Sequence, residues 1–430
     1  MSPPGQDGPD GQEWPEGRST RLVCLVLVFL LAAGRPPVAA QVVAGRGFVD
    51  AAVVLFPQEA TNDATQLIGS LLAREELFFK PARWVQFAAG FDGRANSHDE
   101  VERSWRLDIR DRGTLRPALS ARRLSATLIH GPLTVDVGKQ FIRWGKADIV
   151  TPTDHFAPRD FLGVIDNEFL AVTAARAAVQ WRSESFDGVW VPFFTPSRTP
   201  LLNQRWTAVP SGAESVALFD ASGPLPGGSQ AGVRWGHITG RYEFSLSYFN
   251  GFNHLPNIAI TPGPSPLVVG IAKRYPDLRS YGFDLAVPTG WLTIKSEAAY
   301  SESSTPDSDN YLLYVVQLER QSGEWTFVGG YAGEAVTKHR ARLAFAPDRG
   351  LTRSIVARAA YTIDANRNAG VEAAIRQNGQ GAYVKAEYSQ ARGQHWRATA
   401  TGALIRGEPD DFLGQYRRNS HVTVSLRYSF

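Results

Sequence analysis

Residues 135–161, VDVGKQFIRWGKADIVTPTDHFAPRDF, hold the densest group of side chains capable of chemistry in this chain. Basic and acidic groups follow one another at close spacing, and Pro152 and Pro158 stiffen the backbone between them. Mixed charges of this kind can surround a water-filled passage and discriminate between ions. The candidate lining residues are Lys139, Arg143, Lys146, Asp148, Asp154, Arg159 and Asp160.

Two aromatic side chains in the same segment, Trp144 and Phe156, are suited to anchor it against a neighbouring surface. Because its positive and negative groups nearly balance, the segment predicts neither an anion nor a cation preference. Two other interpretations stay open. The segment could be a solvated outer loop whose charges pair with one another, or Trp144-Gly145 could be a turn with an anchoring ring.

The histidine and serine patterns do not predict an enzyme. His155 beside Asp154 is the one suggestive pair, but a solvated loop histidine explains it better, and the sequence contains no G-x-S-x-G. It also contains no H-E-x-x-H, no cysteine pair and no phosphate-binding glycine loop, so we expect no cofactor and no metal. The acidic stretch SESSTPDSDN, residues 301–310, is interpreted as a solvated loop in preference to a weak calcium site.

The elements that must position the charged segment show the two-residue period of β-strands. Alternation of apolar and polar residues recurs in residues 241–250, 291–300 and 382–389, and it is strict in the last ten residues, HVTVSLRYSF. We therefore predict an all-β fold. The apolar face of the final strand carries Val422, Val424, Leu426, Tyr428 and Phe430.

A soluble sandwich and a membrane barrel both give such alternation, and three features favour the barrel. The segments approach the length of about 9–11 residues that a tilted membrane strand needs. Tyrosine and tryptophan recur at segment ends, and brief connections alternate with long ones. The sequence thus predicts a transmembrane antiparallel β-barrel of roughly 16–18 strands.

The alternation is weaker in the N-terminal half, where a proline, Pro81, makes two of the segments hard to separate. The predicted strands there are residues 46–56, 75–80, 84–91, 103–110, 124–129 and 133–141.

The first 40 residues have the order of a secretory signal. Arg18 and Arg21 precede an apolar run, residues 22–33, and small residues follow up to Ala40. We expect residues 1–40 to be a leader with a signal peptide and residues 41–430 to be the barrel; the true start codon stays open. The only cysteine, Cys24, lies in the leader, so disulfides are not expected.

Two motifs resemble a known family. The run from Gly138-Lys139-Gln140 to Trp144-Gly145, followed by Pro152-Thr153-Asp154, is similar to the segment that precedes an inward-folded loop in porin-like outer-membrane proteins of Gram-negative bacteria. The terminal Tyr428-Ser429-Phe430 resembles the signal by which such barrels are recognised for insertion. The resemblance implies the cell outer membrane as the location. Implied partners are outer-membrane lipid, the barrel-assembly machinery and small solutes, and a homo-oligomer is compatible with it.

We therefore expect a channel for passive diffusion of small solutes, narrowed by residues 142–162. Alternatives that stay open are a barrel with a structural, assembly or polymer-export role, and an outer-membrane hydrolase. A formal net charge of +3 on 430 residues is too small to suggest nucleic acid as a partner. The transported solute, the ion selectivity and the oligomeric state are not decided by the sequence.

Overall fold

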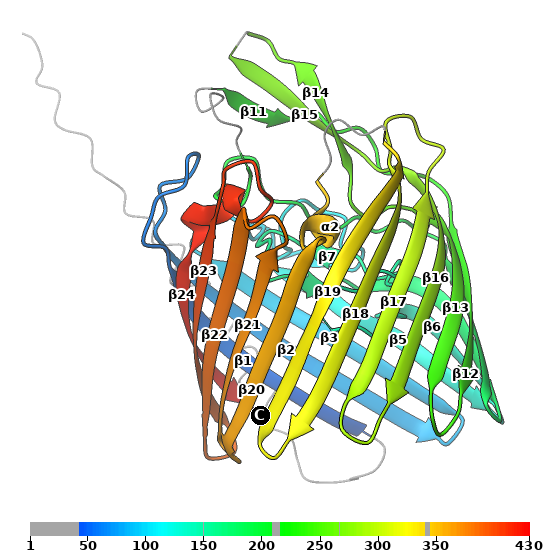
Figure 1. The fold of residues 1–430 in the computed structure, drawn as a ribbon. Coiled ribbons are helices and arrows are strands. Elements are labelled where there is room, and N and C mark those ends of the chain that lie inside the picture. The colour runs from blue at the N-terminus through cyan, green and yellow to red at the C-terminus, as the bar shows by residue number, and fades with distance from the viewer. Residues whose placement is uncertain (1–42, 149, 209–215, 266, 340–344) are drawn as a thin grey trace, which may run out of the picture. The chain divides into compact units, whose positions relative to one another are not determined.

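A computed structural model describes residues 43–430 apart from residues 149, 209–215, 266 and 340–344. The described part forms an antiparallel β-barrel of 18 strands (Figure 1). The prediction of an all-β barrel is confirmed, at the upper end of the expected range of strands. The predicted leader and signal peptide, residues 1–40, lie outside the described residues.

The barrel strands are 8 to 16 residues long, so several exceed the predicted length. They are β1 (Val43–Leu55), β2 (Leu67–Ala82), β3 (Val85–Asn96), β5 (Leu119–His130), β6 (Leu133–Gln140), β9 (Val172–Trp181), β10 (Glu184–Val191), β12 (Gln230–Ile238), β13 (Glu243–Phe252), β16 (Asp277–Pro288), β17 (Thr293–Glu302), β18 (Asn310–Ser322), β19 (Trp325–Lys338), β20 (Ser354–Asp364), β21 (Arg367–Arg376), β22 (Gly381–Arg392), β23 (Trp396–Gly407) and β24 (His421–Ser429).

Short elements occupy the connections between barrel strands. They are β4 (Leu107–Asp108), β7 (Arg159–Asp160), β8 (Glu168–Phe169), β11 (Ala217–Asp220), β14 (Asn257–Pro262), β15 (Val268–Arg274), α2 (Pro347–Gly350) and the 3₁₀ helix η1 (Gly414–Asn419). Within the described residues, no helix has the length and apolar character needed to cross a membrane.

The first and last strands close the barrel. β1 pairs with β2 on one side and with β24 on the other, in a register that runs from Phe48 opposite Ser429 to Leu55 opposite Val422. The final residue continues this seam, because Gly47 and Phe430 exchange backbone hydrogen bonds of 3.1 and 3.0 Å. The strictly patterned C-terminus is thus half of the seam that leaves the sheet without a free edge.

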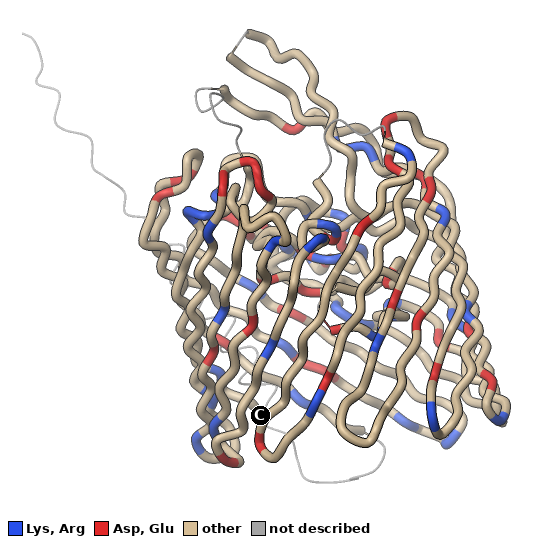
Figure 2. Tube along the Cα trace, viewed as in Figure 1, with Lys and Arg blue, Asp and Glu red and all other residues tan. Residues whose placement is uncertain are grey.

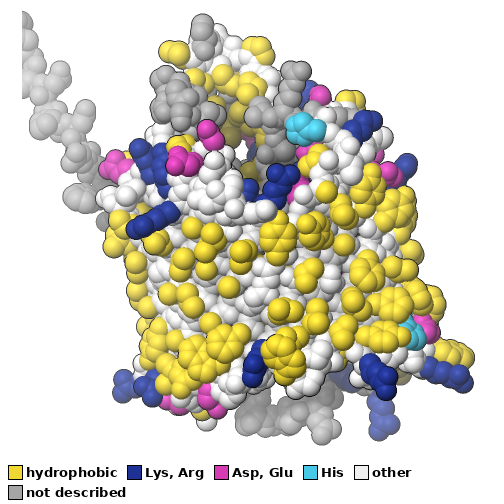
Figure 3. All heavy atoms as spheres, viewed as in Figure 1, with side chains coloured by type: hydrophobic (Ala, Val, Ile, Leu, Met, Phe, Trp, Pro, Cys, Tyr) yellow, Lys and Arg dark blue, Asp and Glu magenta, His cyan; other side chains and the backbone are white. Residues whose placement is uncertain are grey.

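The two faces of β24 meet different surroundings. Val422, Val424 and Leu426 point outward and are 47%, 55% and 48% exposed. Arg427 points into the lumen, where its Nε lies 2.7 Å from Asp50 of β1. Figure 3 shows the result over the visible face: apolar side chains form a broad belt, and charged side chains gather at its two rims.

Tryptophans mark the rim that carries the short turns. Five strongly exposed tryptophans lie at or beside a short turn, where the interfacial girdle of a membrane barrel has its amphipathic rings. They are Trp84, Trp181, Trp291, Trp325 and Trp396.

Brief and long connections alternate around most of the barrel, as predicted, although the connection between β21 and β22 is as short as the turns on the other rim. One predicted strand is wrong. Residues 103–110 lie in the connection between β3 and β5, where only Leu107–Asp108 is extended. The Asp108 carboxylate accepts the backbone N–H groups of Arg110 and Asp111, so a local turn replaces ladder pairing. Pro81 ends β2 rather than interrupting a strand.

Leu426→Arg should destabilise the barrel by about 2–4 kcal/mol, the cost of a basic side chain near the middle of the apolar belt. Ser425→Arg, on the opposite face of the same strand, should cost much less because its side chain stays in water. Urea unfolding of the protein in liposomes measures both. Equal losses of stability would contradict the assignment of faces.

Candidate functional site

The connection between β6 and β9, residues 141–171, folds into the barrel and crosses it; we call it the lumen loop (Figures 1 and 2). It contains most of the charged segment singled out in the sequence. Acidic and basic residues recur along the strands that surround it (Figure 2).

One buried carboxylate holds the centre of the lumen loop. Glu297, on β17, has no exposed surface, and its Oε2 accepts the N–H groups of Lys146 and Ala147 at 3.0 Å each. Its Oε1 accepts the N–H and the hydroxyl of Thr153, both at 2.8 Å. Four donors on one carboxylate fold residues 146–153 around it, which fixes the loop to the barrel wall.

A second carboxylate closes a turn within the loop. Asp154 Oδ1 accepts the N–H groups of Trp144 and Gly145, each at 2.7 Å, and Oδ2 accepts Arg143 Nε at 3.1 Å. A Cβ on Gly145 would lie 2.9 Å from that of Thr151 and 3.0 Å from a Glu297 oxygen, closer than atoms tolerate. The turn thus needs a carboxylate at residue 154 to accept the two N–H groups, and a glycine at residue 145 where there is no room for a Cβ.

Ion pairs attach the loop to the same side of the barrel. Lys146 Nζ lies 2.8 Å from both Glu243 of β13 and Asp284 of β16. Asp148 lies 3.1 Å from Lys295 of β17. These charges neutralise one another across the boundary between loop and wall.

A buried ion network ties the loop to two other connections. Asp160 contacts Arg116 and Arg198 at 2.9 and 3.1 Å, and Asp111 contacts Arg198 and Lys139 at 2.8 and 2.5 Å. Burial alone would raise the pKa of Asp160, but the charges of Arg116 and Arg198 lower it below its usual range. This carboxylate therefore stays ionised in the folded protein.

On the far side, the loop reaches the opposite wall. Asp166 lies 2.5 Å from Lys385 of β22, and Glu168 lies 2.7 Å from Arg94 of β3. Burial opposes ionisation of Asp166, but bonding to His421 and Lys385 lowers its pKa to about 2. The lumen loop is thus held at several points around the circumference.

The two candidate anchors pack against the wall. Trp144 and Phe156 are 2% exposed and meet edge to face at 5.0 Å, and Phe156 packs in the same way on Phe249 of β13. Trp144 Nε1 also donates to Asp187 of β10 at 3.2 Å. Their burial with strand residues adds apolar attachment to the ionic contacts.

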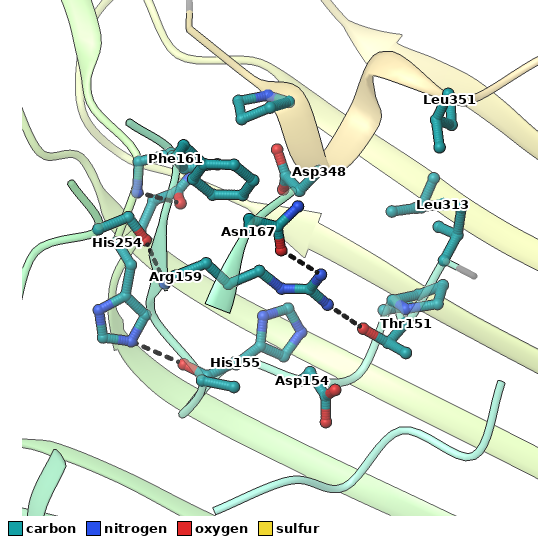
Figure 4. A pocket seen from close by; sticks show the side chains of 18 of the residues that line it. Thr151, Asp154, His155, Arg159, Phe161, Asn167, His254, Leu313, Asp348 and Leu351 are labelled. Carbon is teal, nitrogen blue, oxygen red and sulfur yellow. Dashed lines mark hydrogen bonds between the residues drawn. The ribbon is translucent and has the colours of Figure 1, made fainter. Parts of the chain in front are cut away.

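The space that remains is a pocket of about 270 Å³ between the lumen loop, the wall and α2; we call it the lumen pocket (Figure 4). Arg159 lies in it, donating to Asn167 Oδ1 and Thr151 Oγ1 at 3.1 Å each and stacking on Phe169 at 4.2 Å. Side chains that line the pocket include Arg159, Asn167, Asp348, Arg358, Glu372 and Tyr383.

The sequence-predicted residues therefore occupy three settings. Lys139 and Asp160 are buried in the ion network, and four others are paired within the loop or with the wall. Arg159 lines the lumen pocket and is the one residue among them that forms no ion pair with a described residue. The four paired residues are Arg143, Lys146, Asp148 and Asp154.

Sequence reasoning missed the wall residues that hold the loop. Glu297 and Lys295 fall on the polar face of the alternating residues 291–300, but no pattern links them to a segment about 150 positions earlier. Asp348 was missed because α2 has only four residues and no periodicity.

The His155 and Asp154 side chains do not form a pair. Asp154 is directed at backbone amides and Arg143, while the His155 ring stacks on Phe249 at 5.1 Å. Burial lowers the pKa of His155 to about 4, so the ring is neutral near pH 7. The geometry gives this histidine a packing role.

No protein-family model and no curated protein sequence matches the chain. Solved structures do. OpdQ of Pseudomonas aeruginosa is similar at 11% identity, with a TM-score of 0.51 over 91% of this chain and 99% of that chain. OccAB4 of Acinetobacter baumannii is similar at 10% identity, with a TM-score of 0.54 over 92% of this chain and 100% of that chain.

A BenF-like porin from Pseudomonas fluorescens Pf-5 is similar at 8% identity, with a TM-score of 0.54 over 90% of this chain and 98% of that chain. All three cover nearly the whole of both chains. The chain therefore has the fold of outer-membrane porins, which is the resemblance that its motifs predicted.

Glu297→Gln should loosen the lumen loop, because an amide presents an NH₂ group to donors that now face a carboxylate oxygen. Each donor left without an acceptor costs about 1–3 kcal/mol. Hydrogen exchange of residues 145–153 measures the loss of protection. Glu319→Gln on β18, which removes a single contact to Lys295, is the matched control; equal effects would contradict the anchor.

A titratable contact joins two outer connections. His98 Nε2 lies 3.0 Å from Asp63, and Nδ1 lies 3.5 Å from Glu100, which also contacts Arg116 at 2.8 Å. The hydrogen bond to Glu100 and the charge of Asp63 outweigh burial and raise the pKa of His98. The charged imidazole therefore binds the connection after β1 to the connection after β3.

This contact should depend on pH. With its folded-state pKa above an unfolded value of about 6.5, His98 stabilises fully below that pH and loses the effect as pH rises through the folded-state pKa. His98→Gln should thus lower the melting temperature more at about pH 5.5 than at about pH 8.5. His339→Gln, at a pair whose imidazole is 74% exposed, is the control. A pH-independent loss at His98 would contradict the prediction.

Proposed function

We propose that this protein is an outer-membrane channel through which small solutes diffuse passively. The observation that carries the proposal is a closed barrel with an apolar outer belt and a charged interior that one loop narrows. An apolar belt is stable against acyl chains, and inward-facing charges need water. Solved porins share the fold.

The proposed selection acts by width and by lining charge. Most charged side chains of the lumen loop form ion pairs that hold the loop in place. They therefore affect the width of the passage more than its preference for anions or cations. Attachment at several points around the barrel favours small solutes over a polymer, which would need the loop displaced. Passive diffusion of this kind requires no chemical reaction.

The proposal includes recognition of the C-terminus by the barrel-assembly machinery. Phe430 is held by backbone bonds to Gly47, and Tyr428 packs outward against Trp396 with ring centroids 5.0 Å apart. Before the seam forms, both rings lie on the lipid-facing side of an unpaired strand, where a receptor can read them. The apolar outer belt of the barrel is compatible with a homo-oligomer in the outer membrane.

Purified, folded protein should conduct potassium chloride in planar bilayers, and a folded barrel without current would sink the proposal. Deleting residues 146–158 should raise the single-channel conductance, because it removes the part of the lumen loop that Glu297 holds across the passage. Asp410→Asn, on the exposed connection before β24, is a control that should leave the current unchanged. An unchanged conductance after the deletion would remove the constriction claim.

A further inference from the structure

Almost every charge of the lumen loop is neutralised, which makes the exception informative. Seven charged side chains of residues 141–171 form ion pairs, as does Lys139 just before them; Arg159 forms none with any described residue. The eight are Arg143, Lys146, Asp148, Asp154, Asp160, Asp166 and Glu168 of the loop, together with Lys139 at its root.

Arg159 is nevertheless rigidly held. Its guanidinium is bonded to Asn167 and Thr151, and the ring of Phe169, directly opposite on β8, stacks on it at 4.2 Å. The guanidinium lies among the side chains that line the lumen pocket, with further N–H groups that these two hydrogen bonds do not use (Figure 4). A fixed guanidinium with free donors is suited to receive a carboxylate.

A carboxylate, opposite in charge to Arg159, faces the same pocket. Asp348 of α2 is exposed to the pocket and forms no ion pair with a described residue. Its neighbour Arg349 turns the other way, contacts Glu334 and Asp309, and lies over Tyr311 at 4.1 Å, which fixes the orientation of α2. Desolvation inside the barrel raises the pKa of Asp348, and the charges of Arg349 and Arg159 oppose this effect.

The two groups lie too far apart for a direct ion pair, although each feels the charge of the other. Two further charged side chains line the pocket without an ion pair to the described part of the chain. They are Arg358 and Glu372, which are opposite in sign and directly opposite in register on β20 and β21. Their fields largely cancel. Arg159 and Asp348 therefore remain as one positive and one negative point on the pocket wall.

We infer that the lumen pocket selects zwitterionic solutes about the size of an α-amino acid, with the solute carboxylate on Arg159 and its ammonium on Asp348. The inference rests on the proposed function and gives it a solute class. An anion would be repelled by Asp348 and a cation by Arg159, while a neutral solute would leave both unmatched. The pocket, at about 270 Å³, lies below the range of about 300–1,000 Å³ typical of drug-sized ligands.

The test compares solutes of one size and different charge. Alanine, propionate, ethylammonium and propionamide are each added to single channels conducting potassium chloride, and the half-blocking concentration is measured. Alanine should block at a concentration roughly tenfold lower than any of the other three, as one additional charge-assisted hydrogen bond allows. Equal blocking by alanine and propionate would overturn the inference and leave the channel function intact.

Two variants give opposite signatures that general damage to the fold would not produce. Asp348→Asn should weaken alanine block roughly tenfold and strengthen propionate block, because a repulsive charge is gone. Arg159→Gln should weaken alanine block similarly and strengthen ethylammonium block. Asp410→Asn and Arg418→Gln, exposed and outside the lumen pocket, are the matched controls. Variants that weaken all solutes alike would overturn the inference.

A chain that carries no current would defeat the proposed function but not this inference. In that case, saturation-transfer NMR with alanine and propionate on the detergent-solubilised full chain decides it. Preferential saturation of alanine that Asp348→Asn abolishes would support the pocket. Absence of any preference would overturn it.

Discussion

The structure depends on one constraint: inside a bilayer, backbone N–H and C=O groups find no water and must bond to one another. The first and last described strands, β1 and β24, each have a sequence neighbour on one side only. Their pairing with each other satisfies the backbone groups on the other side. Once the edge is gone, alternation follows, because each strand must present one face to lipid and one to the lumen. The apolar belt and the charged interior are two results of the same closure.

Closure also decides how the lumen loop is held. The wall supplies acids such as Glu297 and Asp284, which could not face lipid, and the loop supplies amides and Lys146 to meet them. On the other side the roles reverse, since Asp166 and Glu168 come from the loop and their cations come from strands. The loop is therefore positioned by acids and cations that face one another inside the closed barrel.

The sequence predicts the regular parts well. Strict alternation in residues 421–430 fixed both the strand and its faces, because period two has one interpretation when lipid lies on one side. Residues 103–110 alternate too, yet turn bonds from Asp108 prevail there. The charged segment was found from composition. Its partners were not, since joining Thr153 to Glu297 requires the register of many intervening strands.

The seam has a consequence for how the molecule is made. Residues 48–55 bond to residues 422–429, so the barrel cannot close until the first and the last of its strands are both in place. The lumen loop depends on the same closure, because its ion pairs reach strands on different sides of the barrel. A chain truncated before β24 would therefore leave β1 and β23 as two free edges of an open sheet.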